Sequence, residues 1–258
     1  MQGLFGAACA KGIGGMNPPG LGIQVDCVSY SYAQRVALDN VALQVETGHF
    51  CALLGPNGAG KSTLFALLTR LFVTRQGRIH IAGFDLAAQP RSALARLGVV
   101  FQQSTLDLDL TVYRNLRYFA ALHGLAGPAA ERRIHAALER LDMRERAGER
   151  ARDLSGGHRR RTEIARALVH APDVLLLDEP TVGLDAASRA SITDQVHTLC
   201  SDEGLTVLWA THLVDEVRAQ DDLVILHRGR VLRQDLAGRI AGDSPLSAAF
   251  LAMTASTP

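Results

Sequence analysis

Residues 50–68 read "FCALLGPNGAGKSTLFALL", and this stretch decides the fold. Its first apolar run predicts a buried strand, the glycine-rich segment predicts a loop, and the closing apolar residues have helical spacing. A strand, a glycine-rich loop and a helix in this order form the first half of a strand–helix–strand unit. The stretch therefore predicts an α/β protein with a parallel sheet.

The glycine-rich loop matches the pattern GxxxxGK[ST] at every fixed position. Its glycines allow backbone N–H groups to surround phosphate oxygens. Lys61 can reach the β- and γ-phosphates of a nucleotide, and the Ser62 hydroxyl can bind Mg²⁺. The candidate nucleotide-binding residues in this phosphate loop are Gly55, Pro56, Asn57, Gly58, Ala59, Gly60, Lys61, Ser62 and Thr63.

A second apolar run, "VLLLDEP" at 174–180, ends in two carboxylates. The carboxyl ends of parallel strands share one edge of a sheet, so this run brings Asp178 and Glu179 close to the phosphate loop. We expect Asp178 to hold Mg²⁺, directly or through water, and Glu179 to orient and deprotonate the attacking water. Without the phosphate loop, the same run would indicate only a core strand and a surface turn.

A third segment, "DLSGGHRRR" at 153–161, predicts a second anion-binding element. Serine is a good helix N-cap, and the first N–H groups of a helix are free to bind an anion. Arg159, Arg160 and Arg161 spread around the predicted helix and do not form one stripe. We interpret these arginines as a solvated helix surface with some contact to nucleotide or to the helical insert that precedes this segment, and not as a nucleic-acid patch.

Composition sets wide limits on function. The 258-residue chain is 47% hydrophobic and has a formal net charge of +1, which gives no support for a nucleic-acid partner. No apolar run reaches the roughly 18 residues that crossing a bilayer requires. The four cysteines form no CxxC pair and have no histidine-rich spacing, so no zinc site is indicated.

The phosphate loop, "LSGG" and "LLLDEP" follow one another in this order, and a helical, charged pattern separates the first two. On these motifs, residues 21–235 resemble the ATP-binding subunit of an ATP-binding cassette (ABC) transporter. Within this family, "GVVFQQSTLDLDLTVYRNL" and "EPTVGLD" resemble the exporter-type subunits. More narrowly, the run from "LGVVFQQ" to "VLWATHL" resembles subunits associated with alcohol dehydrogenase systems that depend on pyrroloquinoline quinone (PQQ). The resemblance implies a P-loop NTPase core with a mixed parallel sheet, an N-terminal antiparallel β subdomain, and a helical insert that carries the signature "LSGG".

This resemblance also fixes the expected domain organisation. Residues 1–20 are expected to be a disordered leader, because they are rich in glycine and proline. Residues 21–237 would form the ATP-binding domain, with a helical subdomain at about 104–160. Residues 238–258 would form a C-terminal helix and tail.

The family resemblance implies that two ATP-binding domains face each other head to tail and enclose two ATP molecules. The signature of one protomer would then contact the ATP that the partner's phosphate loop holds, which explains two anion-binding elements in one chain. These signature residues are Leu154, Ser155, Gly156, Gly157 and His158. His158 stands where the family typically has glutamine, so a weakened or pH-sensitive ATP sandwich is expected.

Other roles are implied position by position. Tyr32 lies where an aromatic ring usually stacks on adenine, although packing of a strand residue is the alternative. Gln102 matches the glutamine that senses Mg²⁺ and the γ-phosphate, with the adjacent Gln103 left as an alternative. Asp185 matches a loop that contacts the opposite subunit, and His212 matches a histidine that binds the γ-phosphate. The expected catalytic residues are Glu179, His212 and Gln102, and the expected metal ligands are Ser62, Gln102 and Asp178.

The implied function is ATP hydrolysis that drives export of an unidentified substrate through a separate integral membrane subunit. ATP and Mg²⁺ are the expected cofactors, a homodimer is the expected assembly, and no nucleic acid is expected. The chain would lie in the cytoplasm, at the inner face of the cell membrane. The alternative is a soluble ABC ATPase that acts on ribosomes or DNA, but such proteins usually have two cassettes or a long coiled-coil insert, and neither is found in this sequence.

Overall fold

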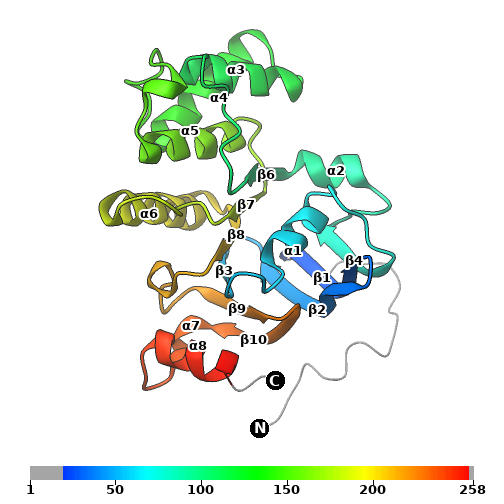
Figure 1. Ribbon diagram of the computed structural model, residues 1–258. Coiled ribbons are helices and arrows are strands. Elements are labelled where there is room, and N and C mark those ends of the chain that lie inside the picture. The colour runs from blue at the N-terminus through cyan, green and yellow to red at the C-terminus, as the bar shows by residue number, and fades with distance from the viewer. Residues whose placement is uncertain (1–19, 256–258) are drawn as a thin grey trace.

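The computed structural model describes residues 20–255, so the expected leader at 1–20 lies outside the described residues except for Gly20. Two β-sheets organise the described chain (Figure 1). The smaller sheet has the strand order β2-β1-β4-β5 and is antiparallel throughout. Its strands are β1 (Leu21–Tyr32), β2 (Arg35–Glu46), β4 (Gln76–Ile81) and β5 (Phe84–Asp85).

The larger sheet has the order β10-β9-β3-β8-β7-β6. Its strands are parallel except for β10, which runs antiparallel to β9. They are β3 (Phe50–Leu54), β6 (Leu97–Val100), β7 (Val174–Asp178), β8 (Thr206–Thr211), β9 (Asp222–His227) and β10 (Arg230–Leu236). The predicted α/β class, with a mixed parallel sheet and an N-terminal antiparallel sheet, is therefore confirmed.

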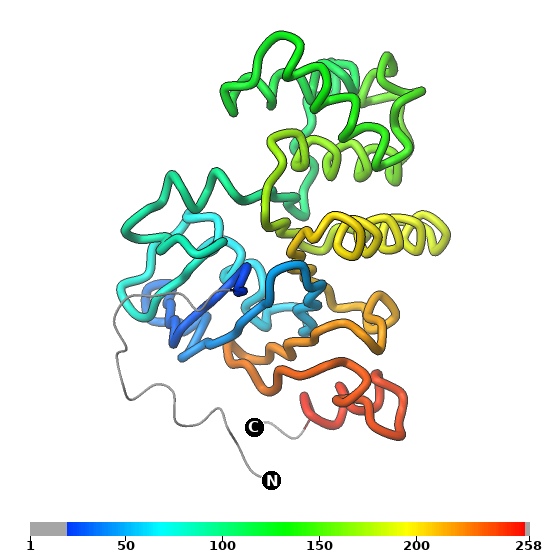
Figure 2. The backbone as a smooth tube through the Cα atoms, turned by 180° about the vertical axis from the view of Figure 1, so that it is seen from behind, coloured from blue at the N-terminus to red at the C-terminus, as the bar shows by residue number. Residues whose placement is uncertain are grey.

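Helices α3, α4 and α5 gather at one end of the molecule, away from the antiparallel sheet (Figures 1 and 2). Helix α3 begins after Thr111, whose hydroxyl accepts the backbone N–H of Arg114 and so caps the helix. The helices of the described chain are α1 (Lys61–Leu68), α2 (Pro90–Ala95), α3 (Val112–Leu122), α4 (Gly127–Arg140), α5 (Gly156–Leu168), α6 (Ala186–Glu203), α7 (Ala237–Ala241) and α8 (Leu246–Ala255).

Strand β7 shows how the larger sheet separates two hydrophobic cores. All five of its residues are buried, and side chains alternate between the two faces of a strand. Leu175 and Leu177 point into the core shared with α3 to α6, whereas Val174 and Leu176 join the core that contains α1 and the antiparallel sheet. Because both faces are covered, the strand reads as the continuous apolar run seen in the sequence.

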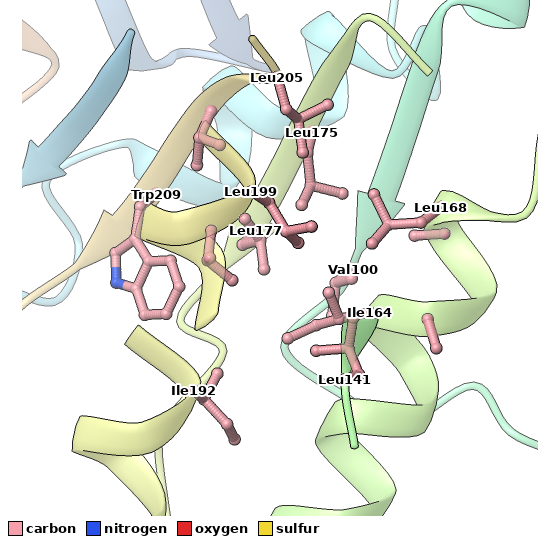
Figure 3. Packing of buried hydrophobic residues seen from close by; sticks show 14 of the residues in the cluster. Val100, Leu141, Ile164, Leu168, Leu175, Leu177, Ile192, Leu199, Leu205 and Trp209 are labelled. Atoms are coloured by element: carbon pink, nitrogen blue, oxygen red, sulfur yellow. The ribbon is translucent and has the colours of Figure 1, made fainter. Parts of the chain in front are cut away.

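The core on the helical side fixes α5 and α6 against the larger sheet. Figure 3 shows Ile164 and Leu168 of α5 beside Val100, the last residue of β6. Ile192 and Leu199 of α6 lie in the same cluster. Burial of a leucine or isoleucine side chain contributes about 1.5–3 kcal/mol, so these contacts hold the two helices firmly in place.

Candidate nucleotide site

The phosphate loop lies between the end of β3 at Leu54 and the start of α1 at Lys61. Gly58 and Gly60 have φ angles of 80° and 110°, a region that glycine enters without strain. A Cβ atom at Gly60 would lie 2.9 Å from the carbonyl oxygen of Ala37. The sequence needs glycine at 60 because both the turn and the neighbouring strand exclude a side chain.

An open cleft of about 920 Å³ surrounds this loop. Its walls include residues 57–63 of the phosphate loop, together with Tyr32, Gln102, Glu179 and His212. The structure thus places in one cleft residues that lie far apart in the sequence. Among the described residues, the signature residues 154–158 and Asp185 do not line this cleft.

Three side chains converge on the carboxylate of Glu179. Lys61 Nζ lies 3.1 Å from its Oε1, and the Gln102 amide donates to its Oε2 at 3.3 Å. His212 Nδ1 lies 3.4 Å from the same Oε2. Lys61 also donates to the carbonyl oxygen of Gly55 at 2.7 Å. This arrangement gathers a cation, an amide and an imidazole around one carboxylate that is only 8% exposed.

Glu179 also has an unusual backbone conformation. Its φ is 46°, in the left-handed region that residues with a side chain rarely enter. The turn directly follows the end of β7 at Asp178, and the Glu179 N–H donates to the carbonyl of Ala210 on β8. Such strain is concentrated at functional sites, where the surrounding structure holds it. The strained turn is consistent with a catalytic role for Glu179.

The residues present fit a magnesium ion. Asp178 is 6% exposed, and its Oδ1 has no hydrogen-bond partner although it is buried. Burial raises the pKa of the Asp178 carboxyl, and the neighbouring Ser62 hydroxyl and Lys61 ammonium oppose that rise. A buried carboxylate oxygen without a partner, beside a hydroxyl, offers the hard oxygen ligands that Mg²⁺ prefers.

Tyr32 packs by its edge and leaves part of its side chain exposed. It makes T-shaped contacts with Tyr30 at 5.2 Å and with Phe72 at 5.7 Å between ring centroids. Its hydroxyl lies 3.4 Å from Thr63 Oγ1 in the phosphate loop, and the residue is 45% exposed. The Tyr32 ring packs against its neighbours and also faces the cleft, so its position agrees both with strand packing and with stacking on adenine. Stacking on adenine stays a prediction.

The signature serine caps α5 as the sequence predicts. The Ser155 hydroxyl accepts the backbone N–H of His158 at 3.3 Å. A Cβ atom at Gly156 would meet only the Leu184 side chain, at 3.1 Å, and one at Gly157 would lie 3.0 Å from Ser188 Oγ. Residues 155–157, which we call the tip of α5, therefore lie against the start of α6. Ser155 and Gly156 are exposed.

Asp185 has a local structural role in the described chain. Its carboxylate accepts hydrogen bonds from the backbone N–H and the hydroxyl of Ser188, which caps α6. These bonds lower the pKa of Asp185. The helix begins at Ala186, directly after this cap. Contact between Asp185 and an opposite subunit stays a prediction.

The interpretation of the three arginines as a solvated surface is wrong for Arg160. Its guanidinium is buried, at 8% exposure, and pairs with Glu163 Oε2 at 2.8 Å. The signal that could have found this pair is the spacing of three residues on the helix, with the glutamate directly before the core residue Ile164. Spacing alone does not show which face the pair occupies, since only packing decides that.

Comparison with known proteins places this geometry in a family. A model of the ABC transporter family matches residues 38–182. The chain is 37% identical to "Nod factor export ATP-binding protein I" of Neorhizobium galegae, over 84% of this chain and 62% of that protein.

The chain belongs to the ABC transporter family.

A second relative is "Daunorubicin resistance ATP-binding protein DrrA3" of Streptomyces coeruleorubidus, which is 36% identical over 86% of this chain and 70% of that protein. Among solved structures, a dimeric bacterial ABC transporter cassette matches with a TM-score of 0.74 and 27% identity, covering 83% of this chain and 98% of that one. The chain thus spans 62% and 70% of the lengths of the two curated relatives. The narrower resemblance to PQQ-dependent systems stays a prediction.

Proposed function

We propose that this ABC family member is an ATP-hydrolysing motor that works as a homodimer and drives export through a separate membrane subunit. One observation carries the proposal. The cleft brings Lys61, Gln102, Glu179 and His212 together, while the exposed tip of α5 lies outside it. A nucleotide held in this cleft would therefore meet a signature tip only from a second copy of the chain.

The cleft residues supply the chemistry of hydrolysis. Lys61 and the N–H groups of the phosphate loop bind the β- and γ-phosphates of ATP. When Lys61 turns to these phosphates, Glu179 loses its ion-pair partner at Oε1 and can accept a proton from the attacking water. Gln102 and His212 lie at the other carboxylate oxygen, where they orient Glu179 and contact the γ-phosphate.

The predicted metal ligands complete this picture. Asp178 and Ser62 would hold Mg²⁺, directly or through water, and Gln102 lies in the same cleft. The ion would neutralise charge on the β- and γ-phosphate oxygens. These roles rest on the unpaired Oδ1 of Asp178 and on its position directly before Glu179.

Dimerisation follows from the exposed tip of α5. Its free N–H groups and the positive end of the helix dipole favour a phosphate. A similar cassette was solved as a dimer, which supports a pair of copies, and we propose that the pair is head to tail. Closure of two copies over two ATP molecules would complete both sites, and hydrolysis with product release would reopen them.

Export is the direction that the relatives favour. Their names describe Nod factor export and daunorubicin resistance. Within residues 20–255, no helix is both long and apolar enough to cross a membrane. Because these relatives are named as ATP-binding proteins, we expect a separate membrane subunit to bind the substrate and to hold this chain at the cytoplasmic face of the membrane.

Affinity purification from native membranes tests the membrane partner. We expect a polytopic membrane protein to co-purify with the tagged chain in mild detergent. Recovery of ribosomes or DNA in its place, with no membrane protein, would contradict the export motor and support the alternative of a soluble ABC ATPase.

His158 gives the proposed ATP sandwich a pH dependence. Its Nδ1 lies 2.9 Å from Ser155 Oγ, the hydroxyl expected to face the partner's ATP. Burial lowers the pKa of His158, and the positive charges of Arg146 and Arg161 lower it further, against Glu149. The imidazole therefore takes up its proton at a lower pH than an unperturbed histidine does. A protonated imidazole donates to the Ser155 hydroxyl oxygen and adds positive charge near the γ-phosphate.

We therefore expect the ATPase rate of the native chain, relative to the His158→Gln variant, to rise as the pH falls from 8 to 6. Rates of both proteins at saturating Mg-ATP, measured across this range, give the ratio. Glutamine cannot change its charge, so the comparison cancels the titration of other groups. A ratio that is constant over the range would remove any role for His158 protonation.

A further inference from the structure

The guanidinium of the buried Arg160 contacts two main-chain carbonyl groups and one carboxylate. Its Nη1 donates to the carbonyl oxygen of Phe101 at 2.8 Å, and its Nη2 donates to the carbonyl oxygen of Gln102 at 2.9 Å. Nη1 also lies 2.8 Å from Glu163 Oε2. A planar guanidinium carries donors on separate nitrogens and so reaches two successive carbonyl groups and a carboxylate at once, whereas a lysine ammonium offers all its donors from a single nitrogen.

The same face of α5 also holds the chain beyond Gln102. The backbone N–H of Thr105 donates to Glu163 Oε1 at 2.9 Å, and Arg166 Nη1 donates to the Thr105 carbonyl at 2.9 Å. Both ends of the segment 101–105 are therefore bound to one helix. The segment has no regular secondary structure of its own, so α5 sets the path of its main chain.

The conformation of this segment matters because of where Gln102 points. Its side-chain amide leaves the segment toward the cleft and donates to Glu179 Oε2 at 3.3 Å. Gln102 is therefore bound at both its main chain and its side chain. Its main-chain carbonyl accepts from Arg160, and its side-chain amide donates to Glu179, the proposed general base. A shift of the main chain would move the amide away from Glu179.

We propose that Arg160, held by Glu163, is a positioning residue for ATP hydrolysis. It fixes the main chain at Gln102 so that the Gln102 amide reaches Glu179, and it joins this segment to the helix that begins with the signature. The inference rests on the proposed roles of Gln102 and Glu179. It implies that a signature tip engaged on the partner's ATP also positions Gln102 in its own cleft, so the two sites communicate through α5.

A buried pair of this kind has a cost, which argues for a function. Burial lowers the pKa of Arg160, and the charges of Glu163 and Asp178 oppose that shift. Replacing a buried ion pair with apolar residues is often neutral or stabilising, so stability alone is a weak reason to keep one. The hydrogen bonds from Arg160 to the carbonyl groups of Phe101 and Gln102 offer a better reason to keep the pair.

The test is a double-mutant cycle on ATP turnover. Alone, Arg160→Met is expected to lower kcat by on the order of tenfold and to change the KM for ATP by less than about twofold, because the phosphate loop is untouched. Arg160→Lys, which keeps the charge and one donor contact, should recover part of the lost rate. In a Gln102→Ala background, Arg160→Met should lower kcat by no more than about threefold further, since Arg160 acts through Gln102.

Two further variants separate positioning from folding. Arg160→Met leaves the buried Glu163 carboxylate without its ion-pair partner. Combining it with Glu163→Gln removes that charge, while the amide oxygen of the introduced glutamine can still accept the Thr105 N–H. We expect the combined variant to regain thermal stability but not kcat. Arg140→Met is the matched control, because Arg140, the last residue of α4, pairs with the exposed Glu203 at the end of α6 and should leave turnover unchanged.

The inference would be overturned if the double variant lost kcat by the full product of the losses in Arg160→Met and Gln102→Ala alone. A recovery of kcat in the variant that combines Arg160→Met with Glu163→Gln would also overturn it, because loss of stability would then explain the effect. If Arg160→Met does not fold, Arg160→Lys takes its place in the cycle with the same criterion. Glu179→Gln measured in parallel separates the two proposals: full activity of that variant would refute the proposed site itself, whatever Arg160 does.

Discussion

Replacing Glu179 with glutamine is expected to lower ATP turnover by at least about a hundredfold, because loss of a general base typically costs 10²–10⁴ in rate. The amide is nearly isosteric with the carboxylate, and Lys61 and the rest of the phosphate loop stay free to hold the phosphates, so ATP binding should persist. Closure of two copies over ATP does not require proton transfer, so the variant should accumulate as a closed dimer.

Steady-state ATPase assays and size-exclusion chromatography in saturating Mg-ATP measure the two effects. Glu203→Gln is the matched control, since Glu203 is an exposed carboxylate that pairs with Arg140 at the surface. A variant that turns over ATP at the native rate would exclude Glu179 as the base. A persistent monomer in saturating Mg-ATP would count against the closed pair.

The second large effect is expected at Gly156, on the tip of α5. Gly156→Asp would place a carboxylate where the partner's γ-phosphate is expected, and like charges repel strongly in a site from which water is excluded. We expect turnover to fall by about a hundredfold or more, as when an essential donor to a reacting group is lost. Binding of ATP to the monomer should change less than about twofold, because residues 154–158 do not line the chain's own cleft.

Gly156→Ala separates charge from volume in this experiment. Both substitutions add a Cβ atom, whose nearest neighbour outside the helix is the flexible Leu184 side chain at 3.1 Å. Alanine should therefore retain far more activity than aspartate. If Gly156→Asp instead weakens ATP binding by the monomer as much as it lowers turnover, the signature acts on its own nucleotide, and the dimer proposal fails.

Local patterns predict much of this site. The strand, glycine loop and helix at 50–68 form where the sequence places them, and the apolar run at 174–178 is strand β7, between β8 and β6. Parallel strands end at one edge of a sheet, so the meeting of Lys61 and Glu179 could be anticipated from topology alone. Backbone geometry that a motif requires, such as the positive φ of Gly60, is likewise encoded locally.

Long-range packing is what the sequence does not disclose. Strands β2 and β3 follow one another along the chain, but they belong to different sheets, and no local feature of the sequence indicates that. Arg160 looks like its neighbours Arg159 and Arg161 in the sequence, yet it alone of the three is buried. Arg160 is buried because the segment 101–105 covers it. Only the fold brings the carbonyl groups of Phe101 and Gln102 to α5.

The central claim is that one protomer cannot build a complete hydrolytic site. The most direct measurement is the ATPase rate per protomer as the protein is diluted, with the monomer fraction followed at the same concentrations by light scattering in Mg-ATP. We expect the specific activity to fall in proportion to the loss of dimer and to approach zero for the monomer. A specific activity that stays constant at dilutions where the chain is wholly monomeric would contradict the claim.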